Sequence, residues 1–166
     1  MIEKFGKSIL TLFGIGYFKY APGTAASIVT CALWLVLYSF KINFLLLVFL
    51  YLILLFYSII LIDKLSKKFS EVDAKEIVID EFLGMSLALI PFYSYLAIHE
   101  RWNRMDDLFV ITLPCFVLFR FFDIVKPFPI NFIDKKLKNG LGVVMDDLIA
   151  GLFSLLIVWV VVFLFL

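Results

Sequence analysis

The sequence predicts an all-α protein, a polytopic membrane bundle of about five transmembrane helices with short interfacial helices. Of its 166 residues, 64% are hydrophobic and 18% are aromatic, and the mean hydropathy is +1.07, whereas soluble domains are about 45 to 50% apolar. The apolar runs approach or reach the roughly 20 residues that a helix needs to cross a bilayer. Lipid leaves only helices or closed barrels as options, and these runs are too long and alternate too little for barrel strands.

The apolar runs define five expected spans within a single membrane-embedded domain, residues 1–166. The spans are expected at residues 24–40, 43–62, 82–98, 108–122 and 143–166. Residues 8–20 are apolar but too few to cross, so residues 1–23 are expected to form an interfacial or re-entrant segment. No cleavable signal peptide is expected, because a compact apolar core followed by a small-residue cleavage site is missing from residues 1–19.

The distribution of basic residues predicts the orientation of the chain. Most of the 15 Lys and Arg side chains fall in three regions, residues 4–19, 64–75 and 120–138. With five spans these regions share one side of the membrane, and the positive-inside rule assigns that side to the cytoplasm. The amino terminus is then expected inside and the carboxyl terminus outside.

Five carboxylates lie at the expected cytoplasmic ends of three spans. They are Asp80, Glu81, Asp123, Asp146 and Asp147. An ionised carboxylate at membrane depth costs several kcal/mol unless it is paired or metal-bound. Helix capping would explain one acid at a helix start, where the macrodipole contributes about 0.3 to 1 kcal/mol. It explains neither adjacent acids at two starts nor Asp123 at a carboxyl end, so a functional role is the preferred hypothesis.

Cations accompany the acids in "FRFFDIVKPFPI", residues 119–130. Arg120, Asp123 and Lys126 recur every three residues, so they line one face of the helix if it continues that far. Local ion pairs would also explain these residues in isolation. The prolines that follow stop the helix, and residues 127–140 are expected to form an amphipathic segment on an anionic inner leaflet.

Small residues in the fifth span, and at the start of the first span, favour a site that binds a metal ion and a phosphate group. Ala150, Gly151 and Ser154 allow a neighbouring helix to approach closely, which would gather the carboxylates into one cluster. Hard divalent cations prefer such oxygen ligands, and Mg²⁺ is usually held by a few carboxylates with waters and substrate phosphate. Gly23 and Thr24 open the first span, where free N–H groups and a hydroxyl can receive phosphate. An ordinary turn and N-cap is an equal alternative there.

Carboxylates for a metal, cations for an anion and a lipid-facing location together predict phosphate chemistry on a membrane-embedded substrate. A thiol phosphatase requires Arg six positions after its Cys, and neither Cys31 nor Cys115 has one there. A phosphohistidine mechanism requires a histidine in the site, and the single histidine, His99, is expected on the opposite side of the membrane. No D-x-D-x-T motif for an aspartyl nucleophile occurs either. The remaining mechanism is a metal-assisted attack, most simply by a bound water.

Four segments resemble, in order and spacing, the motifs of the phosphatidylglycerophosphatase A family. They are "PGTAAS" (22–27), "VIDEFLGM" (78–85), "FRFFDIVKPFPI" (119–130) and "GLGVVMDDLIAG" (140–151). Each motif alone is a weak signal, whereas four in register are specific. Ala26 stands where the family often has glycine, and Asn139 where a Gly-Gly pair is commoner; neither departure removes an ionisable group.

The resemblance implies a Mg²⁺-dependent phosphatase of the bacterial inner membrane that hydrolyses phosphatidylglycerophosphate to phosphatidylglycerol and inorganic phosphate. Its expected partners are a membrane lipid substrate and an anionic phospholipid bilayer, with no nucleic acid, and the oligomeric state stays open. The active site is expected at the cytoplasmic face. The expected catalytic residues and metal ligands are Asp80, Glu81, Asp123, Asp146 and Asp147, and one of them could instead orient or deprotonate the water. The expected phosphate-binding residues are Arg120, Lys126, Thr24 and Gly23.

Two other classes of protein stay open on the residues alone. A small membrane carrier or ion-pathway subunit also uses intramembrane carboxylates. These acids, however, cluster at one boundary, and no pair of interrupted helices repeats in the two halves as inverted-repeat transporters often show. A non-catalytic membrane scaffold predicts that the acids can be neutralised without consequence.

Overall fold

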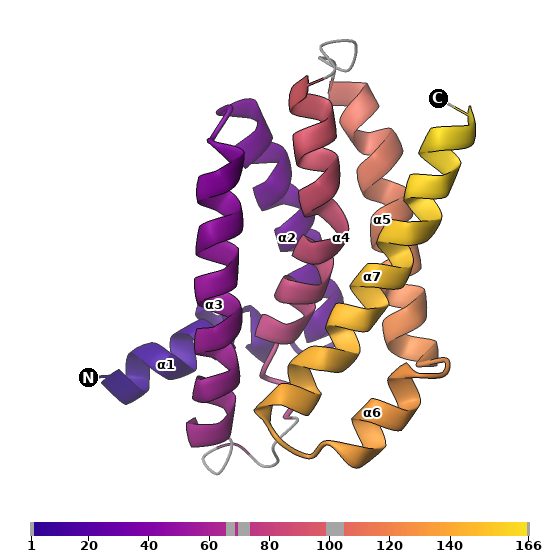
Figure 1. Ribbon diagram of the computed structural model, residues 1–166. Helices are drawn as coiled ribbons and strands as arrows, with labels where there is room; N and C mark the ends of the chain where they lie inside the picture. The colour runs from indigo at the N-terminus through magenta and orange to yellow at the C-terminus, as the bar shows by residue number, and fades with distance from the viewer. Residues whose placement is uncertain (1, 66–68, 70–73, 99–104, 166) are drawn as a thin grey trace.

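The computed structural model describes residues 2–65, 69, 74–98 and 105–165, and every element in these ranges is helical. The elements are α1 (Ile2–Leu10), the 3-10 helix η1 (Leu12–Tyr17), α2 (Pro22–Ser39), α3 (Phe44–Leu65), α4 (Ile79–Ile98), α5 (Met105–Val125), α6 (Ile130–Lys136) and α7 (Gly140–Phe165). Figure 1 shows the long helices side by side, with α1 and α6 toward the end of the bundle where α7 begins. The all-α prediction is confirmed.

Three helices in the described part of the chain are long and apolar enough to cross a membrane. They are α2 over Pro22–Ser39, α3 over Phe44–Leu65 and α7 over Gly140–Val162, and they correspond to the first, second and fifth expected spans. With 20 and 21 residues, α4 and α5 run beside them (Figure 1) and are about 30 Å long at about 1.5 Å per residue. Three of the five spans are thus supported, and membrane crossing by α4 and α5 stays a prediction.

The amino-terminal segment forms two short helices that pack on the bundle. The chain turns at residues 12–14, in the first half of η1, where the φ angles of 48°, 55° and 102° are all left-handed. α1 packs on α3, and the Val78 N–H donates a hydrogen bond of 2.9 Å to the Leu10 carbonyl. Phe13 at the turn is 78% exposed. The interfacial placement expected for residues 1–23 stays a prediction.

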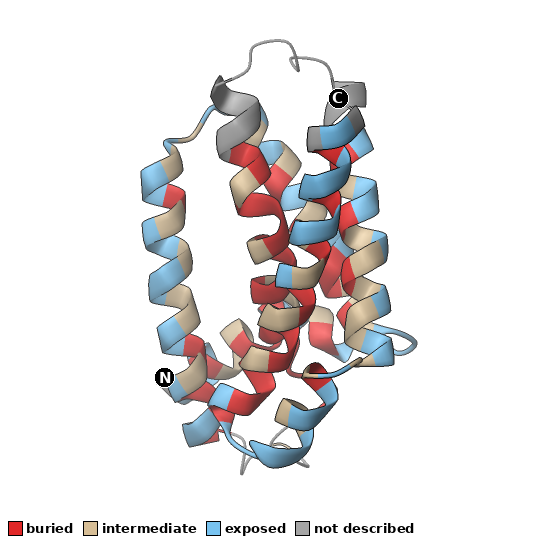
Figure 2. Cartoon of the chain, turned by 45° about the vertical axis from the view of Figure 1, so that its right-hand side comes forward, coloured by how far each residue is buried: buried red, intermediate tan, exposed pale blue. Residues whose placement is uncertain are grey.

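The central helix of the bundle is α4, which contacts α2, α3, α5 and α7. Its buried residues Met85 and Phe92 pack in one apolar cluster with Phe119 of α5 and Ala150 of α7. Figure 2 shows buried residues on the inward faces of the helices and exposed residues on the outward faces. Because α4 also carries the first pair of candidate acids, this core holds them in a fixed position.

α4 and α7 cross closely at two glycines. A Cβ atom on Gly151 would overlap the backbone of Gly84, and one on Gly84 would overlap the backbone carbonyl of Asp147. One turn further along α7, the Ser154 hydroxyl donates a hydrogen bond of 2.8 Å to the Cys115 carbonyl of α5. The small residues of α7 therefore admit neighbouring helices, as the sequence predicts.

The start of α7 is tied to the end of α3. The Gly140 N–H donates a hydrogen bond of 2.6 Å to Oδ1 of Asp63. Asp63 thereby caps α7 from a different helix, because the first N–H groups of a helix have no partner within it. A Cβ atom on Gly140 would overlap the Ile59 carbonyl, so glycine lets the two helix ends meet.

Replacing Gly151 by alanine is expected to destabilise the protein by about 1 to 3 kcal/mol, the common cost of overpacking. The added methyl group would meet the Gly84 backbone, which cannot rotate away. The matched control is Gly6→Ala in α1, where the methyl group would meet only the flexible side chains of Leu61 and Leu65. Denaturant unfolding in detergent micelles measures both variants. Equal stability would contradict the close crossing.

Candidate active site

Three carboxylates from two helices converge near the starts of α4 and α7. Oxygen atoms of Asp80, Glu81 and Asp147 all lie within 4.8 Å of one another. Asp80 is 6% and Asp147 is 4% exposed, and the buried Oε2 atom of Glu81 has no hydrogen-bond partner among the described residues. Ionised carboxylates this close repel one another in a poorly solvated site. The cluster therefore requires a cation or protons to balance it.

The helix boundaries and the close crossing place this cluster. Asp80 and Glu81 occupy the first turn of α4, where the helix dipole stabilises a negative charge by about 0.3 to 1 kcal/mol. α4 begins at Ile79, three residues before the expected span, so both acids belong to the helix itself. Asp147 lies one turn before Gly151 in α7 and therefore shares its helix face. The crossing at Gly151 thus brings the Asp147 carboxylate to the start of α4.

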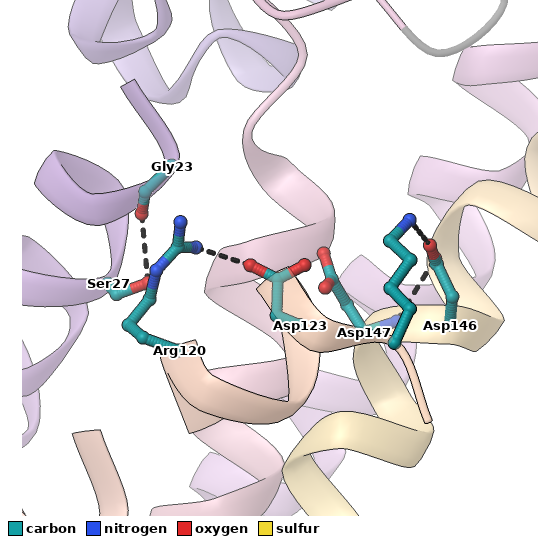
Figure 3. A network of polar contacts seen from close by, with 7 residues as sticks. Gly23, Ser27, Arg120, Asp123, Asp146 and Asp147 are labelled. Carbon is teal, nitrogen blue, oxygen red and sulfur yellow. Dashed lines mark hydrogen bonds and ion pairs between the residues drawn. The ribbon is translucent and has the colours of Figure 1, made fainter. Parts of the chain in front are cut away.

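A further acid and a cation reach the same site from the end of α5. Nη1 of Arg120 lies 2.6 Å from Oδ2 of Asp123, and the two side chains are 16% and 15% exposed. Figure 3 shows Arg120, Asp123 and Asp147 in this order along the site. The buried Nε atom of Arg120 has no hydrogen-bond partner among the described residues. The guanidinium group therefore keeps donor capacity for an anion.

The first turn of α2 closes the site beside Glu81 and Arg120. A Cβ atom on Gly23 would overlap Oε1 of Glu81 and lie 3.1 Å from Nη1 of Arg120. The Gly23 carbonyl accepts a hydrogen bond of 2.9 Å from the Ser27 hydroxyl (Figure 3). Thr24 follows Gly23 in this turn and is half-buried. Glycine at position 23 thus leaves room for the Glu81 carboxylate beside Arg120, and a larger residue there would displace that carboxylate.

Lys126 reaches the site from the turn between α5 and α6. The sequence pattern places Lys126 on the same helix face as Arg120 and Asp123 only if the helix continues that far. It does not: α5 ends at Val125, and Lys126 has a left-handed φ of 45°. The chain leaves the helix one residue early and directs the lysine toward α6 and α7 instead.

Two acids hold the Lys126 ammonium group. Its Nζ atom lies 2.5 Å from Oδ2 of Asp146 and 3.5 Å from Oδ1 of Asp134. Burial by itself lowers the pKa of Lys126, but the hydrogen bond to Asp146 and the charges of Asp146, Asp134 and Asp147 raise that pKa above its ordinary value. The second oxygen of Asp146, Oδ1, accepts a hydrogen bond of 3.1 Å from the Asp147 N–H. Lys126 therefore stays positively charged beside the cluster.

Asp134 contacts Lys126 in the site. The sequence pattern did not single it out, because it lies within the predicted amphipathic segment. It lies in α6, and its side chain is 28% exposed. The fully buried Ile130 precedes it by four residues. Since residues i and i+4 share a helix face, this spacing was the available signal that Asp134 points toward the bundle.

All the residues predicted for the site lie at one end of the bundle, where α2, α4 and α7 begin and α5 ends. The structure gathers three of the five acids into the tightest cluster. It sets Asp123 and Asp146 each beside a cation, and Gly23 against Glu81 and Arg120. Thr24 lies next to Gly23 in the first turn of α2. The arrangement can hold a hard cation and an anion side by side.

The chain is similar over most of its length to known phosphatases. A family model for phosphatidylglycerophosphatase A matches residues 8–162. Phosphatidylglycerophosphatase A of Haemophilus influenzae is 36% identical over 90% of this chain and 83% of its own length. A candidate phosphatidylinositol-3-phosphatase of Bacteroides thetaiotaomicron is 32% identical over 91% of this chain and 92% of its own length.

Phosphatidylglycerophosphatase A of Escherichia coli is 29% identical over 86% of this chain and 74% of its own length. No solved structure gives a significant match. The family model covers all four motifs and every candidate site residue, from Gly23 to Asp147. The chain therefore belongs to the phosphatidylglycerophosphatase A family and is a phosphoric monoester hydrolase.

Proposed function

We propose that this chain hydrolyses phosphatidylglycerophosphate to phosphatidylglycerol and inorganic phosphate, with Mg²⁺ as cofactor, at the cytoplasmic face of a bacterial inner membrane. The observation that carries the proposal is the cluster of Asp80, Glu81 and Asp147 with Arg120 and Lys126 beside it. The names of two relatives support this substrate. The third relative is named for a different lipid, and a phosphate monoester is the group that the two lipids share.

The donor set of the cluster fits a hard divalent cation. It offers only carboxylate oxygens, two of its three acids are buried, and one of its oxygens, Oε2 of Glu81, has no hydrogen-bond partner in the described part of the chain. Asp80, Glu81 and Asp147 would hold the ion. When bound, Mg²⁺ supplies Lewis-acid polarisation of a phosphoryl oxygen and activates a water.

In the proposed reaction the two cations bind the substrate phosphate. Asp123 orients Arg120, whose planar guanidinium group can bind two phosphate oxygens at once. Asp146 and Asp134 orient Lys126, which offsets negative charge as the leaving oxygen departs. Backbone N–H groups at the start of α2, near Gly23, add donors for the same phosphate.

The reaction needs a water on one side of the phosphorus and a leaving oxygen on the other. The water oxygen bonds to phosphorus, the ester P–O bond breaks, and the glycerol oxygen leaves with a proton. One of the five carboxylates orients or deprotonates the attacking water. The acyl chains stay in the bilayer beside the helices, while the headgroup enters the site from the interface.

Neutralising the acids of the cluster is expected to abolish turnover. Asp80→Asn and Asp147→Asn should each lower kcat at least about 100-fold, because even residues that only support metal ligands commonly contribute 10- to 100-fold. Glu76→Gln, a half-buried acid outside the cluster, is the control. Phosphate release from the purified protein measures the rates. Wild-type rates in both Asp80→Asn and Asp147→Asn would end the assignment.

Removing divalent cations is expected to stop phosphate release. A chelator should abolish the activity of the purified protein on phosphatidylglycerophosphate, and excess Mg²⁺ should restore it, because the buried acids repel one another and the phosphate without an ion. The same assay with phosphatidylinositol 3-phosphate tests the substrate. Activity that ignores the chelator would exclude the metal.

Lys126 and Asp146 are expected to act as one unit. Lys126→Ala should lower kcat about 100-fold, as the loss of one transition-state contact commonly does. Asp146→Asn should cost less, and the double variant should be little slower than Lys126→Ala alone, because Asp146 acts through the lysine that it contacts. Steady-state kinetics of the three variants measure this coupling. Effects that multiply would show that Asp146 has a separate role, such as metal binding.

A further inference from the structure

The outward face of α6 carries aromatic rings and lysines side by side. Phe128, Asn131, Phe132, Lys135 and Lys136 line an open hollow, which we call the α6 surface. Phe128 is 82% and Phe132 is 49% exposed, and their ring centroids lie 6.4 Å apart. The Nζ atom of Lys136 lies 4.2 Å from the centroid of the Phe132 ring. None of these residues has a role in the hydrolysis proposed above.

The opposite face of α6 is fixed to the bundle, so the α6 surface has a fixed direction. Ile130 is fully buried in the main apolar cluster, and α6 packs along α7. Asp134 contacts Lys126, which in turn contacts Asp146. Figure 1 shows α6 at the end of the bundle where α7 begins. The carboxylate cluster lies near the same start of α7, because Asp147 belongs to its early turns.

The chemistry of the α6 surface matches the headgroup region of an anionic bilayer. Exposed phenylalanine rings are unfavourable in water, but interfacial helices commonly carry Trp, Phe or Leu on the face that enters the boundary between headgroups and acyl chains. Lysines at that level attract the phosphodiesters of anionic lipids. Lys138, which is exposed just beyond α6, adds to the positive charge. A short helix with apolar and basic residues together is typical of an interfacial element.

We infer that the α6 surface binds the phosphodiester headgroup of an anionic bilayer phospholipid, at a site separate from the carboxylate cluster. Lys135 and Lys136 contact the phosphodiester, and Phe128 and Phe132 lie between the upper parts of the acyl chains. This binding needs neither a metal nor hydrolysis, so it does not depend on the proposed phosphatase activity. Its consequence for catalysis is a fixed depth of the cluster relative to the lipid headgroups.

Photocrosslinking with a phosphatidylserine that carries its reactive group on the headgroup tests the inference. The full chain is reconstituted in phosphatidylcholine vesicles with the probe, and the labelled peptides are mapped. Labelling of residues 128–138 is expected, with a several-fold loss in the double variant Lys135→Gln/Lys136→Gln. The matched control is Lys4→Gln/Lys64→Gln, which removes two exposed lysines of α1 and α3 and should keep the labelling. Unchanged thermal unfolding of both double variants shows that they are folded.

Competitors identify what occupies the surface. Excess unlabelled phosphatidylserine should remove the labelling, and excess phosphatidylcholine should not. Equal labelling by a matched phosphatidylcholine probe, or full labelling of Lys135→Gln/Lys136→Gln, would overturn the inference. Competition by a lipid phosphate monoester but not by phosphatidylserine would assign the surface to substrate capture instead. Crosslinks between two chains at residues 128–138, without lipid labelling, would make it a contact between copies. Phosphate release, assayed separately, decides the proposed function.

Discussion

The close crossing of α4 and α7 at Gly84 and Gly151 is the constraint on which the rest of the structure depends. Neither glycine has room for a Cβ atom, so the two backbones meet directly. Asp147 lies one turn before this contact, and Glu81 lies three residues before Gly84. The distance between the helices therefore sets the distance between the carboxylates. A bundle with larger residues here would keep the same acids but separate them, and the cluster would lose its capacity to share one cation.

The cations beside the carboxylates compensate for the electrostatic cost of burying negative charge. Asp123 lies near the carboxyl end of α5, where the helix dipole opposes a negative charge, and Arg120 one turn earlier compensates for it. Asp146 is buried in α7, and Lys126 compensates for it from the turn after α5. Each outer acid thus has its own cation, whereas the central three have mainly one another. The remaining negative charge is concentrated where a divalent ion is the natural partner.

The sequence predicts those features of the fold and the site that depend on residues close together in the chain. Hydropathy finds the long helices, and the cost of acids in apolar runs singles out five carboxylates, those of Asp80, Glu81, Asp123, Asp146 and Asp147. Local patterns fail where the tertiary structure decides. The spacing of three extends to Lys126, but the helix ends at Val125.

Contacts between distant segments leave no local signal at all. The Asp63 cap on Gly140 joins residues 77 positions apart, and neither residue is unusual in its own segment. The division of the five acids into three clustered and two paired with cations is equally a matter of packing, because all five occur at similar helix ends. The short helices before α2 fold against α3 and the start of α4, which the low polarity of residues 8–20 alone does not reveal.

The acids and cations of the site differ in how far they are exposed to solvent. The central acids Asp80 and Asp147 are 6% and 4% exposed, whereas the side chains of Arg120 and Lys126 are 16% and 27% exposed. In the proposed reaction a phosphate group would therefore meet Lys126, the most exposed of these four groups, before it meets Asp80 and Asp147. Such an order has a physical advantage, because the cations reduce the repulsion between a phosphate monoester and the nearby carboxylates. In the proposed reaction the cations would attract the headgroup first, and an ion held by Asp80, Glu81 and Asp147 would supply Lewis-acid polarisation to a phosphate whose charge is already partly balanced.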